Sequence, residues 1–217
     1  GNVTSCLIKG DALEAGKTYY YRVRAKNALG QSLSSNRVAT DLPSWIATAM
    51  NTADHSKVTY DLDTDTLTFN SSVSLTAPLT VPVNESVNIC VPEGVTVTGA
   101  QDQPAINAVS ESGKTVSLTV YGPGTIKGGN GSDGKPGQPA IDFSKAKGST
   151  TLVVGNTTET TNIIGGDGGN STTTTGGDGG AGIYLYGETP IQKNGNPNIV
   201  GGNGGNGGNG GDGQITN

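Results

Sequence analysis

Glycine-rich triplets near the end of the chain constrain its fold more than any other feature. Residues 201–213 read Gly-Gly-Asn three times and then Gly-Gly-Asp-Gly. In a chain with three residues per turn, every third side chain lies on one edge and the other two edges are bare backbone. Bare edges let neighbouring chains approach closely and exchange N–H···O and Cα–H···O hydrogen bonds. A single tract would not repay the backbone entropy of ordering its glycines, so an ordered tract needs neighbours.

An internal repeat indicates where such neighbours come from. Each copy has an alternating apolar strand, a Gly or Asn turn, a second strand ending in Gly, a polar or Gly-rich excursion, and then Ala-Ile or Gly-Ile. Ile106 and Ile141 are 35 residues apart, and Ile141 and Ile183 are 42 apart. A repeat of this length without helical periodicity predicts an all-β fold, a parallel β-helix or solenoid. The copies span 87–107, 116–143 and 150–186, and a fourth starts within 196–205.

The short strands of these copies are rich in β-branched residues, which predicts that their apolar positions stack inside the solenoid. The excursions fall at one equivalent place in successive copies, so we expect them to lie side by side as polyglycine II tracts. The alternative is that they are mobile Gly/Asn linkers attached to the solenoid. The predicted core consists of Ile89, Val91, Val95, Val97, Ile106, Leu118, Val120, Ile126, Ile141, Leu152, Val154, Ile163 and Ile183.

The first forty residues have a different pattern. After a turn at Gly16, residues 19–25 alternate between an apolar and a cationic face, which predicts a strand. Turn residues at 27–30 and a second short strand complete a predicted β-hairpin. This segment resembles the C-terminal part of a fibronectin type III domain, with Leu13 and Tyr19 at the positions of that family's tyrosine corner.

Three segments are therefore expected. Residues 1–41 form the C-terminal portion of a fibronectin type III-like module, 42–70 form a linker and a solenoid cap, and 71–217 form the Gly-rich β-solenoid repeats. A cap is expected because a stacked array needs its terminal layer covered. His55, the only histidine, is interpreted as a loop residue because no Ser or Cys nucleophile motif accompanies it.

The order of these segments resembles bacterial cell-surface proteins in which fibronectin type III spacers precede right-handed parallel β-helices. That resemblance implies binding to polysaccharide, to a host surface or to other copies, and some relatives are polysaccharide lyases. The Gly-rich tracts also resemble the tail-fibre adhesins of T-even-like bacteriophages, whose polyglycine II tracts carry loops that bind the bacterial receptor. The matching tracts here are 128–137, 165–182 and 201–213, with loops at 143–162 and 184–198.

Composition excludes several function classes. Only 14% of residues are charged, the net charge is −5, and there is no basic cluster, which argues against nucleic acid as a partner. No apolar stretch is long enough to insert into a membrane. No Arg follows Arg37 and the later lysines have no ordered partner set, which argues against catalysis.

We therefore expect a non-enzymatic adhesin segment, extracellular or on a virion surface, that recognises a glycan or a cell-surface partner. One alternative is a structural stalk or filament subunit that assembles with neighbouring copies of itself. The other is a β-helix polysaccharide lyase.

Two sets of residues are candidates for a site. If Ile183 and Leu185 point inward, then Tyr184 and Tyr186 point outward, about 7 Å apart, a spacing suited to stacking on sugar rings. The alternative is an aromatic pair packed under the following loop. No cofactor is expected, and calcium is the one ion considered, because 128–136 nearly fits a calcium-binding nonapeptide but has Lys135 at its aliphatic position. The aspartates that would contribute to a calcium site are Asp133, Asp167 and Asp178.

Overall fold

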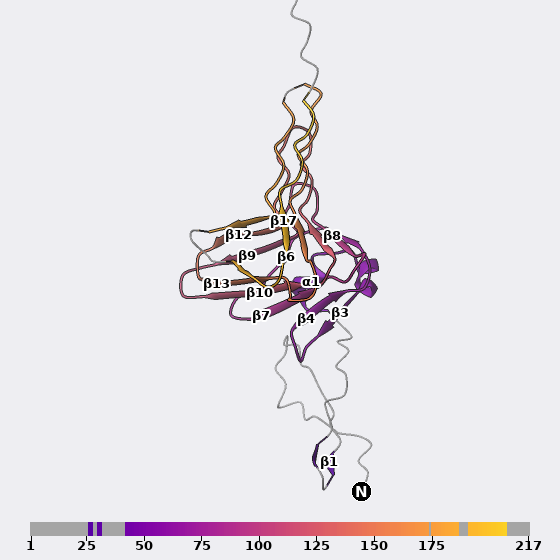
Figure 1. Cartoon of the computed structure of the whole chain (residues 1–217), viewed down its shortest axis with the longest axis vertical. Helices are drawn as coiled ribbons and strands as arrows, with labels where there is room; N and C mark the ends of the chain where they lie inside the picture. The colour runs from indigo at the N-terminus through magenta and orange to yellow at the C-terminus, as the bar shows by residue number, and fades with distance from the viewer. Residues whose placement is uncertain (1–25, 28–29, 32–41, 174, 187–190, 208–217) are drawn as a thin grey trace, which may run out of the picture.

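The computed structural model describes residues 26–27, 30–31, 42–173, 175–186 and 191–207 (Figure 1). Near the N-terminus, β1 (Lys26–Asn27) and β2 (Gly30–Gln31) pair antiparallel. This pairing agrees with the hairpin turn expected at 27–30. The rest of the segment interpreted as a fibronectin type III-like module lies outside the described residues.

Three sheets form the body of the molecule. All pairings within them are parallel except that of β3 with β4, which is antiparallel. The predicted all-β class is therefore confirmed. In spatial order, the six-stranded sheet contains β16 (Ile191–Lys193), β13 (Ser149–Val154), β10 (Thr115–Tyr121), β7 (Ser86–Cys90), β4 (Thr66–Phe69) and β3 (Val58–Asp61). The five-stranded sheet contains β17 (Asn198–Val200), β14 (Asn162–Ile164), β11 (Thr125–Lys127), β8 (Thr96–Thr98) and β5 (Val73–Ser74), and the four-stranded sheet contains β15 (Ile183–Leu185), β12 (Ile141–Ala146), β9 (Ile106–Ser110) and β6 (Leu79–Thr80).

The chain visits the three sheets in rotation, so that one circuit contributes one strand to each sheet, as β7, β8 and β9 do. Ile106, Ile141 and Ile183 stand in register on neighbouring strands of the four-stranded sheet. The alignment of the Ala-Ile and Gly-Ile dipeptides predicted this register. The first circuit begins with β4 at Thr66, before the expected boundary at residue 71.

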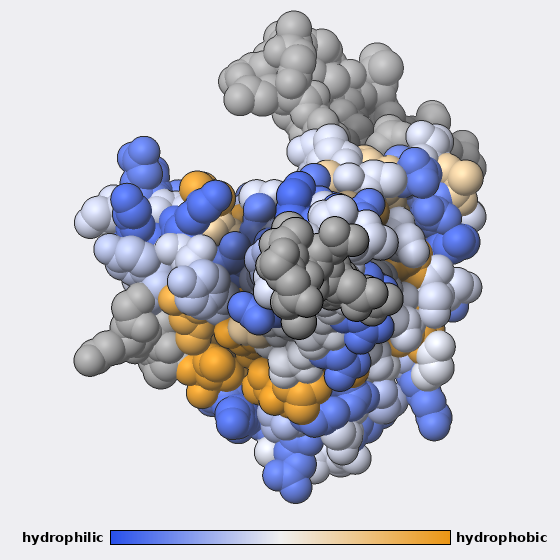
Figure 2. All heavy atoms as spheres, turned by 90° about the horizontal axis from the view of Figure 1, so that it is seen from above, coloured by the Kyte–Doolittle hydropathy of each residue, from blue (hydrophilic) through white to orange (hydrophobic). Residues whose placement is uncertain are grey.

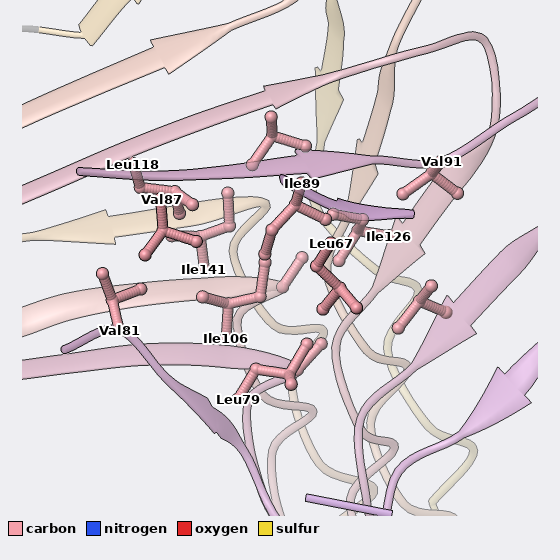
Figure 3. Packing of buried hydrophobic residues seen from close by; sticks show 14 of the residues in the cluster. Leu67, Leu79, Val81, Val87, Ile89, Val91, Ile106, Leu118, Ile126 and Ile141 are labelled. Carbon is pink, nitrogen blue, oxygen red and sulfur yellow. The ribbon is translucent and has the colours of Figure 1, made fainter. Parts of the chain in front are cut away.

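Apolar side chains of successive circuits pack inside the three sheets. Figure 3 shows Ile89 from the six-stranded sheet, Ile126 from the five-stranded sheet and Ile106 from the four-stranded sheet converging on one interior. Burying a side chain of this size contributes about 1.5–3 kcal/mol. Every residue of the predicted core is buried except Ile183, which is partly buried on the last strand of its sheet.

A short cap covers the first circuit. It consists of α1 (Ser44–Ala47) and the 3-10 helix η2 (Thr52–Lys57), which precede β3. Ile46, Ala49 and Met50 are buried, and the carbonyl oxygen of Ala49 accepts the N–H of Thr76 at 2.9 Å. His55 belongs to this cap, where its Nε2 lies 3.2 Å from the Ala47 carbonyl oxygen.

Gly-rich excursions leave the body after β11, β14 and β17 and extend side by side in one direction (Figure 1). Their outgoing tracts are 128–134, 165–171 and 201–206, and the return tracts of the first two are 135–140 and 176–182. Neighbouring outgoing tracts are joined by backbone hydrogen bonds that repeat every third residue. Gly128, Gly131 and Gly134 donate to the carbonyls of Ile164, Asp167 and Asn170, and Gly165, Gly168 and Ser171 donate to those of Val200, Asn203 and Asn206. The described tracts are therefore hydrogen-bonded to one another. Mobile linkers, the alternative considered from the sequence, would not have this regular pairing.

The second glycine of each triplet lies against backbone on its inner side. A Cβ at Gly129, Gly166 or Gly202 would come within 3.0 Å of a carbonyl oxygen of the neighbouring tract or loop. The N–H of Gly166 donates to the Gln138 carbonyl at 2.8 Å, and the N–H of Gly202 donates to the Gly180 carbonyl, also at 2.8 Å. Only glycine fits at these positions, because backbone fills the space that a side chain needs.

The third residue of each triplet forms a side-chain ladder across the tracts. Asn130 Oδ1 accepts the N–H of Asp167 at 3.0 Å, and Asp167 Oδ1 accepts the N–H of Asn203 at 2.9 Å. One triplet further out, Asn170 Oδ1 accepts the N–H of Asn206 at 2.7 Å. Asn and Asp at this position therefore replace the backbone acceptor that the third N–H of the triplet lacks.

Candidate functional site

Strand β15 places the two candidate tyrosines on the outside of the four-stranded sheet. Ile183 and Leu185 are partly buried against the core, whereas the Tyr184 side chain is 58% exposed and that of Tyr186 is 50% exposed. This alternation is the one that the sequence predicted. The exposed rings therefore present apolar surface to solvent at the last strand of this sheet.

The residues that stand in register with Tyr184 on the neighbouring parallel strands form a row across the sheet. Tyr184 stands beside Asp142 on β12, which stands beside Asn107 on β9, which stands beside Thr80 on β6. Neighbouring strands are about 4.8 Å apart, so the row is about 14 Å long. The two central members are partly exposed, and both ends are exposed. The row therefore combines an aromatic ring with a carboxylate, an amide and a hydroxyl.

A second set of exposed side chains lies alongside this row. Val109 is 53% exposed on β9 and is in register with the exposed Lys145 on β12, after a bulge that begins at Asp142. Tyr186 follows Tyr184 by two residues, which carries the chain about 6.6 Å further. We call the whole surface the tyrosine face. Its members are Thr80, Asn107, Val109, Asp142, Lys145, Tyr184 and Tyr186.

Asp142 and Asn107 contribute the acceptor oxygens of the tyrosine face. Asp142 Oδ1 accepts the N–H of Ser144 at 2.9 Å, which holds the carboxylate in place while Oδ2 has no partner among the described residues. Asn107 Oδ1 is buried, and no described group donates a hydrogen bond to it. The outer carboxylate oxygen of Asp142 can therefore accept a hydrogen bond from a ligand hydroxyl, whereas the buried Asn107 Oδ1 is closed to a ligand.

This combination has a definite chemical capability. Aromatic rings offer flat apolar faces on which the C–H faces of a sugar ring can stack, and carboxylate oxygens accept hydrogen bonds from sugar hydroxyls. The face is an exposed sheet surface whose row runs across the strands. It is therefore an open surface that suits an extended ligand rather than a small molecule that must be enclosed.

The aspartates considered for calcium are engaged differently or point into solvent. Asp167 Oδ2 forms an ion pair with Lys127 Nζ at 2.5 Å, and Asp133 and Asp178 are exposed. The hydrogen bond from Lys127, followed by that from the Asn203 N–H, lowers the pKa of the Asp167 carboxyl below its usual value. Within the described part of the chain, no three His, Cys, Asp or Glu side chains are grouped closely enough to hold a metal ion.

A second carboxylate, that of Asp102, binds the first outgoing tract at Ser132. Asp102 accepts the N–H of Ser132 at 2.8 Å through Oδ1 and the Ser132 hydroxyl at 2.7 Å through Oδ2. These two hydrogen bonds lower the pKa of the partly exposed Asp102 carboxyl. Both Asp102 and Asp167 thus have structural partners within the tracts.

The structure brings Tyr184 together with Asp142 and Asn107, which sequence reasoning did not single out. A signal was present in the repeat itself. Each of these three residues directly follows the isoleucine of an Ala-Ile or Gly-Ile dipeptide, and those isoleucines are in register. Comparing the residues one place after the repeated isoleucine would have identified the row.

Comparison with protein-family models, with curated proteins and with solved structures gives no match for this chain. Among the described helices, none has the length and apolar character needed to cross a membrane. The assignment of the tyrosine face as a candidate site therefore depends only on the geometry of its residues.

Proposed function

We propose that this chain is a non-enzymatic recognition segment of an extracellular or virion-surface protein and that its tyrosine face binds a glycan. The observation that carries the proposal is the clustering of exposed apolar side chains. Of the five large hydrophobic side chains that are exposed among the described residues, Val109, Tyr184 and Tyr186 belong to this one face. Exposed apolar surface gathered on one face marks an interaction site more often than scattered exposure does.

The proposal includes a finer description of the scaffold. The circuits form a parallel β-solenoid, and the Gly-rich tracts adopt the polyglycine II conformation, which has three residues per turn. The rotation of the chain through three sheets and the three-residue period of the tract hydrogen bonds support this description. A rigid scaffold of this kind would hold the side chains of β9, β12 and β15 at fixed spacings, which favours binding of a repeating polymer.

A glycan array followed by titration calorimetry tests the proposal. We expect binding to at least one polysaccharide, loss of that binding in Tyr184→Ala, and retention in Tyr184→Phe, because the stacking ring is kept. Asp142→Asn should weaken binding less than Tyr184→Ala, because the amide still accepts one hydroxyl. Val200→Ala is the matched control, since Val200 is an exposed apolar residue of the five-stranded sheet. Wild-type affinity in Tyr184→Ala would rule out the tyrosine face as the site.

A second candidate function is supported by the opposite end of the solenoid from the cap. Among the described residues, no strand pairs with the outer edges of β15, β16 and β17. Ile183, Ile191 and Ile199 of these strands are only partly buried, and Val200 is 41% exposed. The view from above shows hydrophobic atoms gathered beside the tracts (Figure 2). Unpaired edges of this kind are templates for another chain, which favours a structural subunit that assembles with copies of itself.

Light scattering across a hundredfold range of protein concentration separates the two functions. A recognition segment remains monomeric while it binds glycan. A structural subunit increases in mass with concentration, whether or not glycan is present. Polymers that form without any glycan binding would leave the structural function as the better account.

A further inference from the structure

The tyrosine face contains one irregularity, a β-bulge in β12. Asp142 on β12 is in register with Asn107 on β9. Three residues further along β12, Lys145 is in register with Val109, which lies only two residues further along β9. In an uninterrupted strand, residues three apart point to opposite faces of the sheet. The extra residue in the bulge instead places both Asp142, which is partly exposed, and Lys145, which is exposed, on the outer face.

The bulge also fixes the Asp142 carboxylate. The N–H of Ser144, inside the bulge, donates to Asp142 Oδ1 at 2.9 Å. Among the described residues, neither Asp142 Oδ2 nor Lys145 Nζ has a hydrogen bond or an ion pair. Bulges are frequent beside functional sites, where they redirect a side chain. This one presents an oriented acceptor and a cationic donor that are not paired with each other.

An exposed apolar side chain and an aromatic ring stand beside these two groups. Val109 is 53% exposed and lies one strand away from Lys145, a separation of about 4.8 Å. Tyr184 lies one strand away from Asp142 on the other side, at a similar separation. Along the strands, the register separates Asp142 from Lys145 by two steps, or about 6.6 Å. A flat ring, a free carboxylate oxygen, an ammonium group and an apolar side chain therefore lie within three neighbouring strands.

We propose that the tyrosine face selects sugars that carry an acetamido group, as N-acetylhexosamines do, a specificity that rests on the glycan binding proposed above. The sugar ring stacks on Tyr184, and the acetamido N–H donates to Asp142 Oδ2. The acetamido carbonyl oxygen accepts a hydrogen bond from Lys145 Nζ, which its flexible four-carbon stem carries over the face. The methyl group covers Val109 and removes apolar surface from water. A hydroxyl on the same ring carbon would use only one of these groups and would leave Val109 exposed.

Oligosaccharides in matched pairs test this specificity. Hexamers of N-acetylglucosamine and of glucose with the same linkage differ only in the acetamido or hydroxyl group on one ring carbon. Hexamers of N-acetylgalactosamine and of galactose form a second such pair. In titration calorimetry, we expect the dissociation constant to be lower by about tenfold or more for the acetamido member of at least one pair. A net hydrogen bond together with a buried methyl group produces a difference of this size.

Substitutions at two exposed positions separate the acetamido contacts from the stacking contact. Val109→Ser and Lys145→Met should each reduce the preference for the acetamido member by about threefold or more. The affinity for the hydroxyl member should stay close to wild type. Val200→Ser and Lys114→Met are matched controls at exposed residues of the same types, outside the tyrosine face, and should keep the wild-type preference. All four variants should keep the wild-type thermal midpoint, because surface substitutions of this kind change stability little.

Several results would overturn the specificity while leaving the proposed glycan binding intact. One is a hydroxyl hexamer that binds as tightly as its acetamido counterpart, and another is the absence of binding by either pair when a different glycan on the array binds. An unchanged preference in both Val109→Ser and Lys145→Met would show that the acetamido group is recognised somewhere else. Failure to bind any glycan would instead overturn the proposed function, and this specificity with it.

Discussion

The strand body and the Gly-rich tracts both repeat along the molecule, but they are ordered by different groups. In the body, side chains such as Leu118 and Ile126 fill the interior, and the sheets hold them in register. In the tracts, the interior is backbone, and Gly129, Gly166 and Gly202 are packed against carbonyl oxygens. The body is therefore sensitive to the loss of side-chain atoms, whereas the tracts are sensitive to their addition.

Deleting core atoms should have the largest effect. Leu118 is fully buried in β10, the strand that pairs with both β7 and β13. We expect Leu118→Ala to reduce the free energy of unfolding by about 2–5 kcal/mol, because it leaves a cavity in a closely packed interior. Chemical denaturation measures this change. Thr151→Ala, on the exposed side of β13, is the control and should stay within about 0.5 kcal/mol of wild type.

Adding one methyl group to a tract should have the next largest effect. A Cβ at Gly166 would overlap the Gly129 carbonyl oxygen, and backbone on both sides cannot move away without breaking hydrogen bonds. We expect Gly166→Ala to cost about 1–3 kcal/mol, as overpacking does in closely packed interiors. A neutral result in denaturation would show that the tracts tolerate side chains, and the contrast with the body would then disappear.

Removing one member of the side-chain ladder should cost less. Asn130 Oδ1 accepts the N–H of Asp167, so Asn130→Ala leaves that donor without its partner and should cost about 0.5–1.5 kcal/mol. Asn206 is the matched control, because its backbone N–H is bound while no described residue donates to its side chain. Asn206→Ala should therefore change stability by less than Asn130→Ala. Equal effects of the two substitutions would show that the ladder contributes nothing.

The smallest effect should be a pH dependence that comes from the tracts. The folded-state pKa of Asp167 is lowered by Lys127 and the Asn203 N–H, so its stabilisation is complete above the unfolded-state value of about 3.9. It is lost as pH falls through the folded-state pKa, and it amounts to about 0.5 kcal/mol or less at this partly exposed site. Denaturation between pH 2 and 6 should show a shallower pH dependence in Asp167→Asn than in wild type.

The body could be predicted from sequence because its rules are local and repeat. Alternation placed Ile89, Ile126 and Ile141 inside, and the repeated Ala-Ile dipeptide predicted the register of three strands. That the Gly-rich tracts lie side by side followed from their equivalent places in the repeat. Which N–H pairs with which carbonyl did not follow, because a repeated Gly-Gly-Asn or Gly-Gly-Asp triplet presents the same side chains again after every shift of three residues.

The tyrosine face shows the limit of reading one segment at a time. Tyr184 and Tyr186 are two residues apart in sequence and were predicted, whereas Asp142 and Asn107 come from earlier circuits and join them only through strand pairing. The resemblance of residues 1–41 to a fibronectin type III domain stays a prediction, since only four of those residues are described.

The three-residue period of the tract hydrogen bonds also governs how this region can change in length. Inserting a whole triplet into an outgoing tract and another into its return tract keeps every backbone N–H opposite a carbonyl oxygen. It also keeps every Asn or Asp side chain on the same edge of its tract. Each such pair of insertions would move the tip of the excursion outward by about 9 Å, the rise of three residues in an extended chain with three residues per turn. An insertion of one or two residues would instead rotate a side chain onto the neighbouring backbone. The height of the excursions above the body can therefore vary only in steps of three residues, and the sheets beneath do not need to change when it does.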